Sequence, residues 1–215
     1  MAETTDKRYP AEALRAFATS LFSAAGLEDD KADAVSRFLV EADLLGHTTH
    51  GLALAGWYLQ SVADGVMTVS GAPDVISDRG PAIAWKGKRL PGAWLTSEAV
   101  KLASNRAAQY GTATVTIADS HHIGCLAAYL TLATDRGYMV SIASSSPSGA
   151  QVAPFGGTKG VYTPNPVARH PDTRRSHSHR YQRLDHHGEH GPAPGSRRQA
   201  IRARLAARRE RQSEP

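Results

Sequence analysis

The sequence has a single cysteine, no apolar run long enough to cross a membrane, and no apolar leader at its start. Cys125 alone cannot form a disulfide within the chain, so a disulfide framework is excluded and a reducing compartment is favoured. No stretch approaches the roughly 18 apolar residues that suggest a transmembrane helix. The starting sequence, MAETTDKRYP, is polar and unlike a secretory signal. We therefore expect a cytoplasmic protein that has no membrane partner.

Two common nucleotide-binding signatures are also absent. The sequence contains neither the G-x-G-x-x-G pattern of dinucleotide-binding folds nor the G-x-x-x-x-G-K-[ST] pattern of P-loops. If this chain binds a nucleotide, it does not hold it in the usual Rossmann manner.

Residues 169–215 lack Lys, Phe, Trp, Met, Val, Cys and Asn. They hold 12 Arg and 6 of the chain's 10 His, and their net charge is +7, whereas residues 1–168 carry a net charge of −2. The basic character of the chain therefore comes from this tail, which has the composition of a disordered, solvated segment. Nucleic-acid binding by the folded part is not indicated.

Helical hydrophobic spacing dominates residues 1–70. We expect a first helix over Pro10–Ala25, a second from about Asp29 and a third over Leu52–Ala63. The apolar face of the first comprises Leu14, Phe17, Leu21 and Phe22, and that of the second comprises Val35, Phe38, Leu39, Ala42 and Leu45. These helices should form an N-terminal bundle, with the sequence HTTH at the corner between the second and the third.

Residues 71–168 alternate strand-like and helix-like segments. Strands are expected over Asp74–Ser77, Ala82–Trp85, Thr112–Ala118 and Tyr138–Ser144, and helices over Ala93–Tyr110 and Cys125–Arg136. The order strand, helix, strand over residues 112–144 predicts a βαβ unit and a partly parallel sheet. The fold class is therefore α/β, with a helical segment at 1–70, a partial α/β domain at 71–168 and a disordered Arg/His-rich tail at 169–215.

Three clusters of residues could carry chemistry. The first is GHTTHG, residues 46–51, at the expected helix–helix corner. The second is DSHHIG, residues 119–124, directly after a predicted buried strand, where ligands of open α/β sheets bind. The third runs from VAPFGG, residues 152–157, to TPNP, residues 163–166, and combines a glycine pair with two stiffening prolines.

Each cluster also has an ordinary structural explanation. A histidine beside a glycine at a helix end often only caps or packs, and a glycine pair often only forms a turn. Cys125 is expected to be a small buried apolar residue rather than a nucleophile. Trp57, Trp85 and Trp94 are most simply core or lid residues.

Taken together and in this order, the clusters resemble the malate/L-lactate dehydrogenase family that is unrelated to Rossmann-type lactate dehydrogenases and that includes ureidoglycolate dehydrogenase and 2,3-diketogulonate reductase. GHTTHG matches the family's G-H-x-[ST]-H-G motif. DSHHIG matches N-S-x-H-x-G, with Asp119 in place of Asn, and VAPFGG with PNP matches V-A-P-x-G-G…N-P. The resemblance extends from the first helix to about Ala168.

The resemblance implies an NAD- or NADP-dependent oxidoreductase that acts on small 2-hydroxy or 2-oxo acids. It also implies a mixed-sheet, non-Rossmann cofactor domain and a homodimer. His122 is the expected acid–base residue, because the chemistry needs a proton carrier beside the substrate oxygen, and His50 is the second catalytic candidate. Thr49, Ser120 and His121 are expected to contact or support substrate, and no metal ligand is expected. The expected cofactor-binding residues are Ser145, Pro154, Gly156, Gly157, Asn165 and Pro166.

Two departures from the family pattern stand out. Relatives often carry an acidic residue where this chain has Ser146, before Pro147. After the Asn165–Pro166 motif the match stops. Arg, His, Pro, Ala and Gly without Lys, Phe or Asn are typical of GC-rich coding sequence read out of frame, and a one-base shift with allowed synonymous codons can give a sequence that resembles the family's continuation. We therefore expect a reading-frame shift near Arg169 and a chain that is truncated and poorly soluble, for which catalysis must be shown rather than inferred.

Two alternatives from other functional classes remain open. A metal-dependent hydrolase could use His47, His50, His121 and His122, although no Asp, Glu or Cys ligand stands near them at metal spacing. A non-enzymatic protein could instead use its tail, either through the histidines between His177 and His190 as loose metal ligands, or through Arg197–Arg211 as a basic helix for nucleic acid or an acidic membrane surface.

Overall fold

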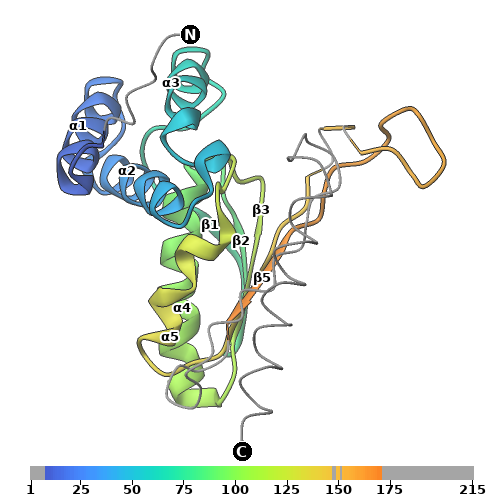
Figure 1. Ribbon diagram of the computed structural model, residues 1–215. Helices are drawn as coiled ribbons and strands as arrows, with labels where there is room; N and C mark the ends of the chain where they lie inside the picture. Colours follow the sequence, from blue (N-terminus) through green and yellow to red (C-terminus); the bar gives the residue numbers. More distant parts are fainter. Residues whose placement is uncertain (1–7, 147–148, 151, 171–215) are drawn as a thin grey trace, which may run out of the picture. The chain divides into compact units, whose positions relative to one another are not determined.

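The computed structural model describes residues 8–146, 149–150 and 152–170, which fall into two compact units. The first unit contains residues 8–145 and 165–170 and holds all the helices and strands named below (Figure 1). The second is formed by the described residues between Ser146 and Pro164, in which Val152 and Tyr162 form one antiparallel bridge. The predicted boundary at residue 70 stays a prediction.

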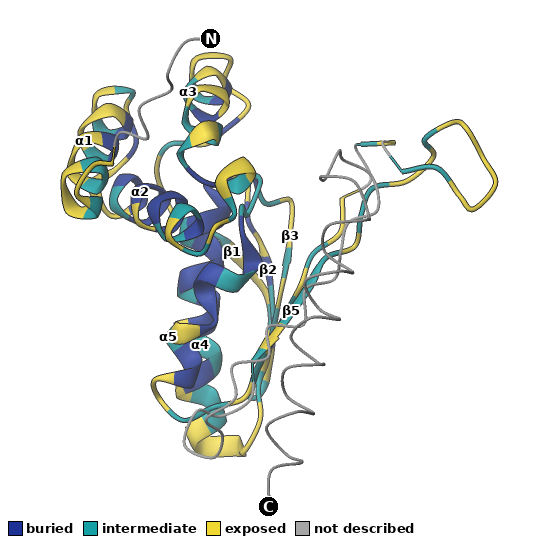
Figure 2. Ribbon diagram, viewed as in Figure 1, coloured by how far each residue is buried: buried dark blue, intermediate teal, exposed yellow. Residues whose placement is uncertain are grey.

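Three helices build the N-terminal part, as the sequence predicts. They are α1 (Ala11–Ala24), α2 (Asp29–Leu44) and α3 (Ala55–Ala63), and the corner before α3 forms two short 3-10 turns, η1 (Thr48–His50) and η2 (Leu52–Leu54). Figure 2 shows that α2 is the most deeply buried of the three. The predicted stripe of α2 is buried, with Val35, Phe38 and Leu39 in the helical core.

The predicted apolar face of α1 is right at Phe22, which is buried, and wrong at Phe17 and Leu21, which are exposed. Ala18 and Phe22 are buried, whereas Phe17 is 64 % exposed and Leu21 is 37 % exposed. The helix packs through Ala18 as well as Phe22, and a pattern of large apolar side chains does not identify an alanine as an interface residue. The core cluster joins α1 and α2 with Tyr58 of α3 and with Tyr129.

A three-stranded sheet follows, in the order β1 (Asp74–Arg79), β2 (Ala82–Lys86) and β3 (Thr114–Ala118). β1 pairs antiparallel with β2, and β2 pairs parallel with β3. The parallel pair is connected by α4 (Gly92–Tyr110), which packs through Ala99 onto Ile83 and Trp85 on one face of the sheet (Figure 1). A partly parallel sheet is therefore present.

The predicted βαβ unit over residues 112–144 is wrong. β4 (Val140–Ala143) does not join β3 but pairs antiparallel with β5 (Val167–His170) in a separate sheet. The intervening helix is also broken into η3 (Leu126–Tyr129) and α5 (Thr131–Thr134). Such short pieces do not form the long crossover helix that usually joins two parallel neighbours. The βαβ unit is instead β2–α4–β3.

The predicted start of the tail at residue 169 falls inside a strand. Arg169 and His170 belong to β5, where they pair with Ser141 and Val140. Residues 171–215 lie outside the described residues, and so do Pro147 and Gln151. The predictions that the tail is disordered, or that it binds metal, nucleic acid or a membrane, refer to these tail residues. Among the helices that the structure describes, none is long and apolar enough to cross a membrane.

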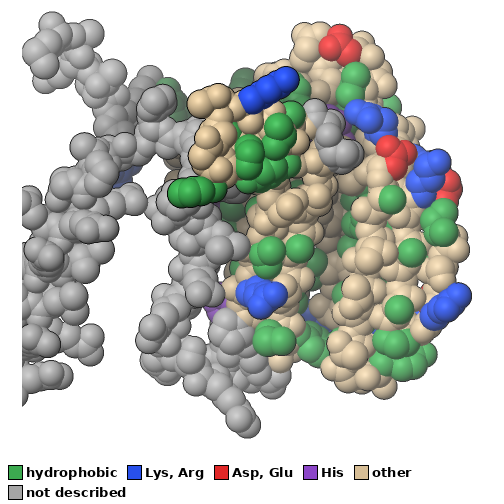
Figure 3. Space-filling view, turned by 90° about the vertical axis from the view of Figure 1, so that its right-hand side faces the viewer, with side chains coloured by type: hydrophobic (Ala, Val, Ile, Leu, Met, Phe, Trp, Pro, Cys, Tyr) green, Lys and Arg blue, Asp and Glu red, His purple; other side chains and the backbone are tan. Residues whose placement is uncertain are grey.

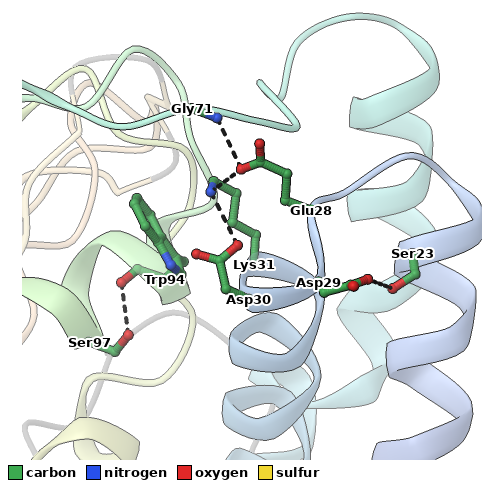
Figure 4. Close-up of polar contacts among 8 residues, drawn as sticks. All are labelled: Ser23, Glu28, Asp29, Asp30, Lys31, Gly71, Trp94 and Ser97. Carbon is green, nitrogen blue, oxygen red and sulfur yellow. Dashed lines mark hydrogen bonds and ion pairs between the residues drawn. The ribbon is translucent and has the colours of Figure 1, made fainter.

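A buried lysine connects the start of α2 to α4 and to the chain before β1 (Figure 4). The Lys31 side chain is 2 % exposed, and its Nζ lies 2.5 Å from Glu28 Oε2 and 3.3 Å from Asp30 Oδ1. The same ammonium lies 4.1 Å from the centre of the Trp94 ring. Glu28 Oε2 also accepts the Gly71 N–H at 3.1 Å. Lys31 and this backbone donor lower the pKa of Glu28 below its usual value.

Because the Lys31 stem and ammonium are both packed, we expect Lys31→Ala to lower the free energy of unfolding by about 2 kcal/mol. Lys101 is the matched control, since it forms a similar i,i+3 pair with Glu98 but is 57 % exposed. Lys101→Ala should change stability by less than about 0.5 kcal/mol. Equal urea midpoints for the two variants would contradict the structural role of the buried lysine.

Candidate active site

The GHTTHG sequence forms the corner between α2 and α3. Gly46, at φ +79°, ends α2 in a left-handed conformation, and residues 48–50 then form η1. Asp43 Oδ2 accepts the Leu52 N–H at 2.8 Å and so connects α2 to the start of η2. A Cβ on Gly51 would lie 2.1 Å from Asp43 Oδ1, which explains the glycine at that position. The corner carries the His50 side chain on a fixed backbone.

The DSHHIG sequence forms a loop that leaves the carboxyl end of β3. Asp119 at φ +55° and Gly124 at φ +67° set its two bends. The Asp119 carbonyl accepts the Arg89 N–H at 2.7 Å, and the Leu90 carbonyl accepts the His121 N–H at 3.1 Å. The loop is therefore bonded along its backbone to the chain between β2 and α4. It follows a strand as predicted, but β3 is not buried: its residues alternate between exposed and half-buried.

The corner and the loop meet in a group of five side chains that we call the ring cluster: His50, Trp57, Tyr58, His121 and His122. The His50 and His122 rings are stacked with centroids 5.9 Å apart. Trp57 lies 5.4 Å from His121 and 5.3 Å from His122 between ring centroids, and Tyr58 lies 5.5 Å from His121. The fold thus brings together the two histidines that the family resemblance implies are catalytic.

His122 is held at one nitrogen. The Tyr58 hydroxyl oxygen lies 2.7 Å from His122 Nδ1, and the Gly124 N–H donates to the same atom at 3.3 Å. Tyr58 is 2 % exposed, and burial raises its pKa well above the usual value, so the phenol is neutral. With Nδ1 occupied by these contacts, Nε2 is the ring nitrogen that remains for other chemistry.

Burial keeps both loop histidines neutral. Burial, with a smaller effect of His50, lowers the pKa of His122 from 6.5 to about 4. Burial also lowers the pKa of His121 to about 4, with smaller contributions from His122 and Arg89. His121 is 6 % exposed, and its Nδ1 has no hydrogen-bond partner among the described residues. A neutral imidazole in this setting can donate a hydrogen bond from one nitrogen or accept a proton on the other.

The family model of the malate/L-lactate dehydrogenases matches residues 9–175, which include both histidine motifs. The chain belongs to this family. It is 31 % identical over 160 residues to hydroxycarboxylate dehydrogenase B of Escherichia coli (strain K12), covering 74 % of this chain and 44 % of that enzyme. It is 29 % identical over 154 residues to L-lactate dehydrogenase of Cupriavidus necator, covering 71 % of this chain and 44 % of that enzyme.

Solved structures agree with this assignment. Malate dehydrogenase from Pyrococcus horikoshii OT3 superposes with a TM-score of 0.73 at 26 % identity, over 79 % of this chain and 48 % of that one. A dehydrogenase from Sinorhizobium meliloti superposes with a TM-score of 0.68 at 27 % identity, over 76 % of this chain and 48 % of that one. The fold class implied by the sequence resemblance is confirmed. The chain spans less than half the length of the relatives it matches.

The other residues expected near substrate have local partners. Thr49 Oγ1 lies 3.0 Å from His50 Nδ1 and orients that ring. The Ser120 hydroxyl donates to the His121 carbonyl at 2.7 Å, so it supports the loop. His121 packs between Trp57 and Tyr58 in the ring cluster. Roles for these residues in substrate binding stay predictions.

The expected cofactor-binding residues lie in two places. Ser145 and Asn165 are exposed, and the Ser144 N–H donates to the Pro166 carbonyl at 3.1 Å, so the chain after β4 runs beside the chain before β5. Pro154, Gly156 and Gly157 form a turn within the second unit, in which the Gly157 N–H donates to the Pro154 carbonyl at 2.8 Å. Binding of a cofactor by these residues stays a prediction.

Sequence reasoning missed Tyr58 as a partner of His122 and assigned Trp57 only to packing. No motif signals Tyr58, because the bond to His122 joins residues that are 64 positions apart. Cys125 is buried in the helical core and burial raises the pKa of its thiol, which agrees with the predicted apolar role. Among the described residues, no group of three or more His, Cys, Asp or Glu side chains could hold a metal ion.

Gly92 sets the position of the histidine loop and provides a test of it. A Cβ on Gly92 would lie 2.4 Å from the His121 carbonyl oxygen and 2.5 Å from that of His122. Gly92→Ala should therefore displace the loop and cost about 1–3 kcal/mol of stability. Gly56 in α3 has open space around its Cβ position, so Gly56→Ala should be neutral or stabilising by up to about 1 kcal/mol. Thermal unfolding of the two variants measures both changes in stability. A neutral Gly92→Ala would show that Gly92 does not fix the position of the loop.

The two low histidine pKa values predict how stability depends on pH. Between pH 6.5 and about 4 the unfolded chain binds protons at His121 and His122 that the folded chain does not bind. Lowering the pH through this window should therefore reduce the free energy of unfolding, by at most about 1.4 kcal/mol per pH unit for each histidine. Urea unfolding at a series of pH values measures the slope. His122→Asn should make the slope shallower, and an unchanged slope would contradict the low pKa of His122.

Proposed function

We propose that this chain carries the acid–base half of an NAD- or NADP-dependent oxidoreductase that interconverts small 2-hydroxy and 2-oxo acids. The observation that supports it most is the ring cluster, in which two histidines from separate family motifs stack beside each other and His122 is kept neutral. The curated relatives named above are hydroxycarboxylate and lactate dehydrogenases, and both are more than twice as long as the matched part of this chain.

His122 is suited to carry the proton of the reaction. When a 2-hydroxy acid is oxidised, its O–H bond breaks and the proton must leave as the C–H hydrogen departs with its electron pair; in reduction both are returned. His122 Nε2 is the position at which this chain would take up or supply that proton. Its low pKa keeps the ring uncharged near neutral pH, and an uncharged ring accepts a proton at Nε2 only when its own hydrogen is on Nδ1. His50, stacked on it, would orient the substrate oxygen.

A nicotinamide cofactor would accept or supply the hydride. The described residues offer polar groups that fit such a ligand, because Ser145 and Asn165 present an exposed hydroxyl and an exposed amide at the ends of neighbouring chain segments. The family resemblance also implies Pro154, Gly156, Gly157 and Pro166 as cofactor residues, and we keep them in the proposal. A cytoplasmic location and a homodimer are part of the same proposal.

The alternative functions are less well supported. No group of metal-binding side chains exists in the part of the chain that the structure describes. On the right-hand side of Figure 3, Lys and Arg side chains lie among Asp and Glu side chains and do not form a patch of one charge. Residues 1–168 carry a net charge of −2, so the basic alternative depends on the tail, of which residues 171–215 lie outside the described part of the chain.

The test is a comparison of His122→Asn with the intact 215-residue chain. With NADH or NADPH and a small 2-oxo acid such as pyruvate or oxaloacetate, the intact chain should oxidise the cofactor, and His122→Asn should lower kcat by about 10²–10⁴-fold. His47→Asn is the matched control, because His47 shares the first histidine motif but lies outside the ring cluster. Full activity in His122→Asn would remove His122 from the mechanism. If the intact chain neither binds nor oxidises either cofactor, the proposed function is wrong for this chain.

A further inference from the structure

The contacts at His122 Nδ1 define which nitrogen of the neutral ring carries the proton. The Gly124 backbone N–H points at Nδ1, with a nitrogen–nitrogen distance of 3.3 Å, and a backbone N–H cannot turn away as a hydroxyl can. If Nδ1 carried a hydrogen, two hydrogens would face each other in this half-buried site. Nδ1 must therefore be the lone-pair nitrogen, and the ring proton must be on Nε2.

Tyr58 reinforces the same state. The phenol is neutral and has one hydrogen to donate, with two acceptors in reach: His122 Nδ1 at 2.7 Å and the His122 carbonyl oxygen at 3.5 Å. The shorter contact is within the normal range for a hydrogen bond and the longer one is at its limit. A Cβ on Gly124 would lie 3.8 Å from the Tyr58 oxygen, so the glycine lies close to the phenol.

We propose that Tyr58 is a positioning residue that, together with the Gly124 N–H, fixes neutral His122 as the tautomer with hydrogen on Nε2. The free nitrogen of the resting site is then a hydrogen-bond donor. It matches a carbonyl oxygen, which only accepts hydrogen bonds, so the resting site is prepared to recognise the 2-oxo form of the substrate. This last step rests on the proposed function, whereas the tautomer does not.

Tyr58 is also a core residue, which explains how the tautomer is maintained. Its ring belongs to the helical core cluster with Phe22, Phe38 and Tyr129 and also contacts the His121 ring, while its hydroxyl bonds His122. A hydroxyl held by a packed ring cannot follow the histidine if the imidazole turns. A proton on Nδ1 would force the Tyr58 hydroxyl to turn and accept, and it would oppose the Gly124 N–H, which can only donate.

The tautomer is measured directly by NMR of the full chain labelled with ¹⁵N in the histidine rings, at neutral pH. The His122 signals are assigned as those absent from His122→Asn. We expect Nε2 to show the shift of a protonated ring nitrogen and Nδ1 that of an unprotonated one. Hydrogen mainly on Nδ1, or shared evenly between the two nitrogens, would overturn the proposal. This result needs no variant of Tyr58 and does not depend on whether the chain is active.

Tyr58→Phe then tests the role of the hydroxyl, because it keeps the packed ring and removes only the donor. The fraction of the Nδ1–H tautomer should rise by about five-fold, the effect of one net hydrogen bond. Tyr129→Phe is the matched control, since Tyr129 is equally buried and its hydroxyl donates to the Ile123 carbonyl in the same loop, not to His122. An equal shift in both variants, or none in Tyr58→Phe, would show that the phenol does not set the tautomer.

Discussion

The site depends on one constraint: the histidine loop after β3 packs against aromatic side chains of α3, which bury His121 and half-bury His122. Tyr58 provides the link, because its ring is part of the core while its hydroxyl bonds His122. Burial next to these rings penalises a charged imidazole, which is why the pKa values of both loop histidines lie near 4. Chemistry at Nε2 of His122 then starts from an uncharged ring in a fixed orientation.

Elements far apart in the sequence share in this constraint. The corner after α2 brings His50 onto the His122 ring, and the chain before α4 holds the loop from the other side through Leu90 and Gly92. The parallel pair β2–β3 places the loop at the carboxyl edge of the sheet, where the β2–α4 connection also lies. The same packing that stabilises the fold therefore orders the candidate catalytic groups, and a substitution such as Gly92→Ala should affect both.

Local sequence was sufficient for some parts of this account and not for others. Periodicity located α2 and its buried stripe, and motif order located His50 and His122 and indicated the family. Part of the face of α1 was misplaced because Ala18 carries little hydrophobic weight in a pattern although it lies at the interface. The strand partner of β4 was misplaced because pairing with β5 is a contact between distant segments, which the order of elements does not reveal. Tyr58 was missed for the same reason.

The central claim is that the core desolvates His122 and keeps it neutral. The most direct test is to follow the His122 ring signals of the full chain by NMR as the pH is lowered, with His122→Asn to identify them. The account predicts that the ring titrates near pH 4, well below the ordinary histidine value of 6.5. Titration at or above 6.5 would mean that the ring is solvated and free of the cluster, and the proposed role of the site would then have to be abandoned.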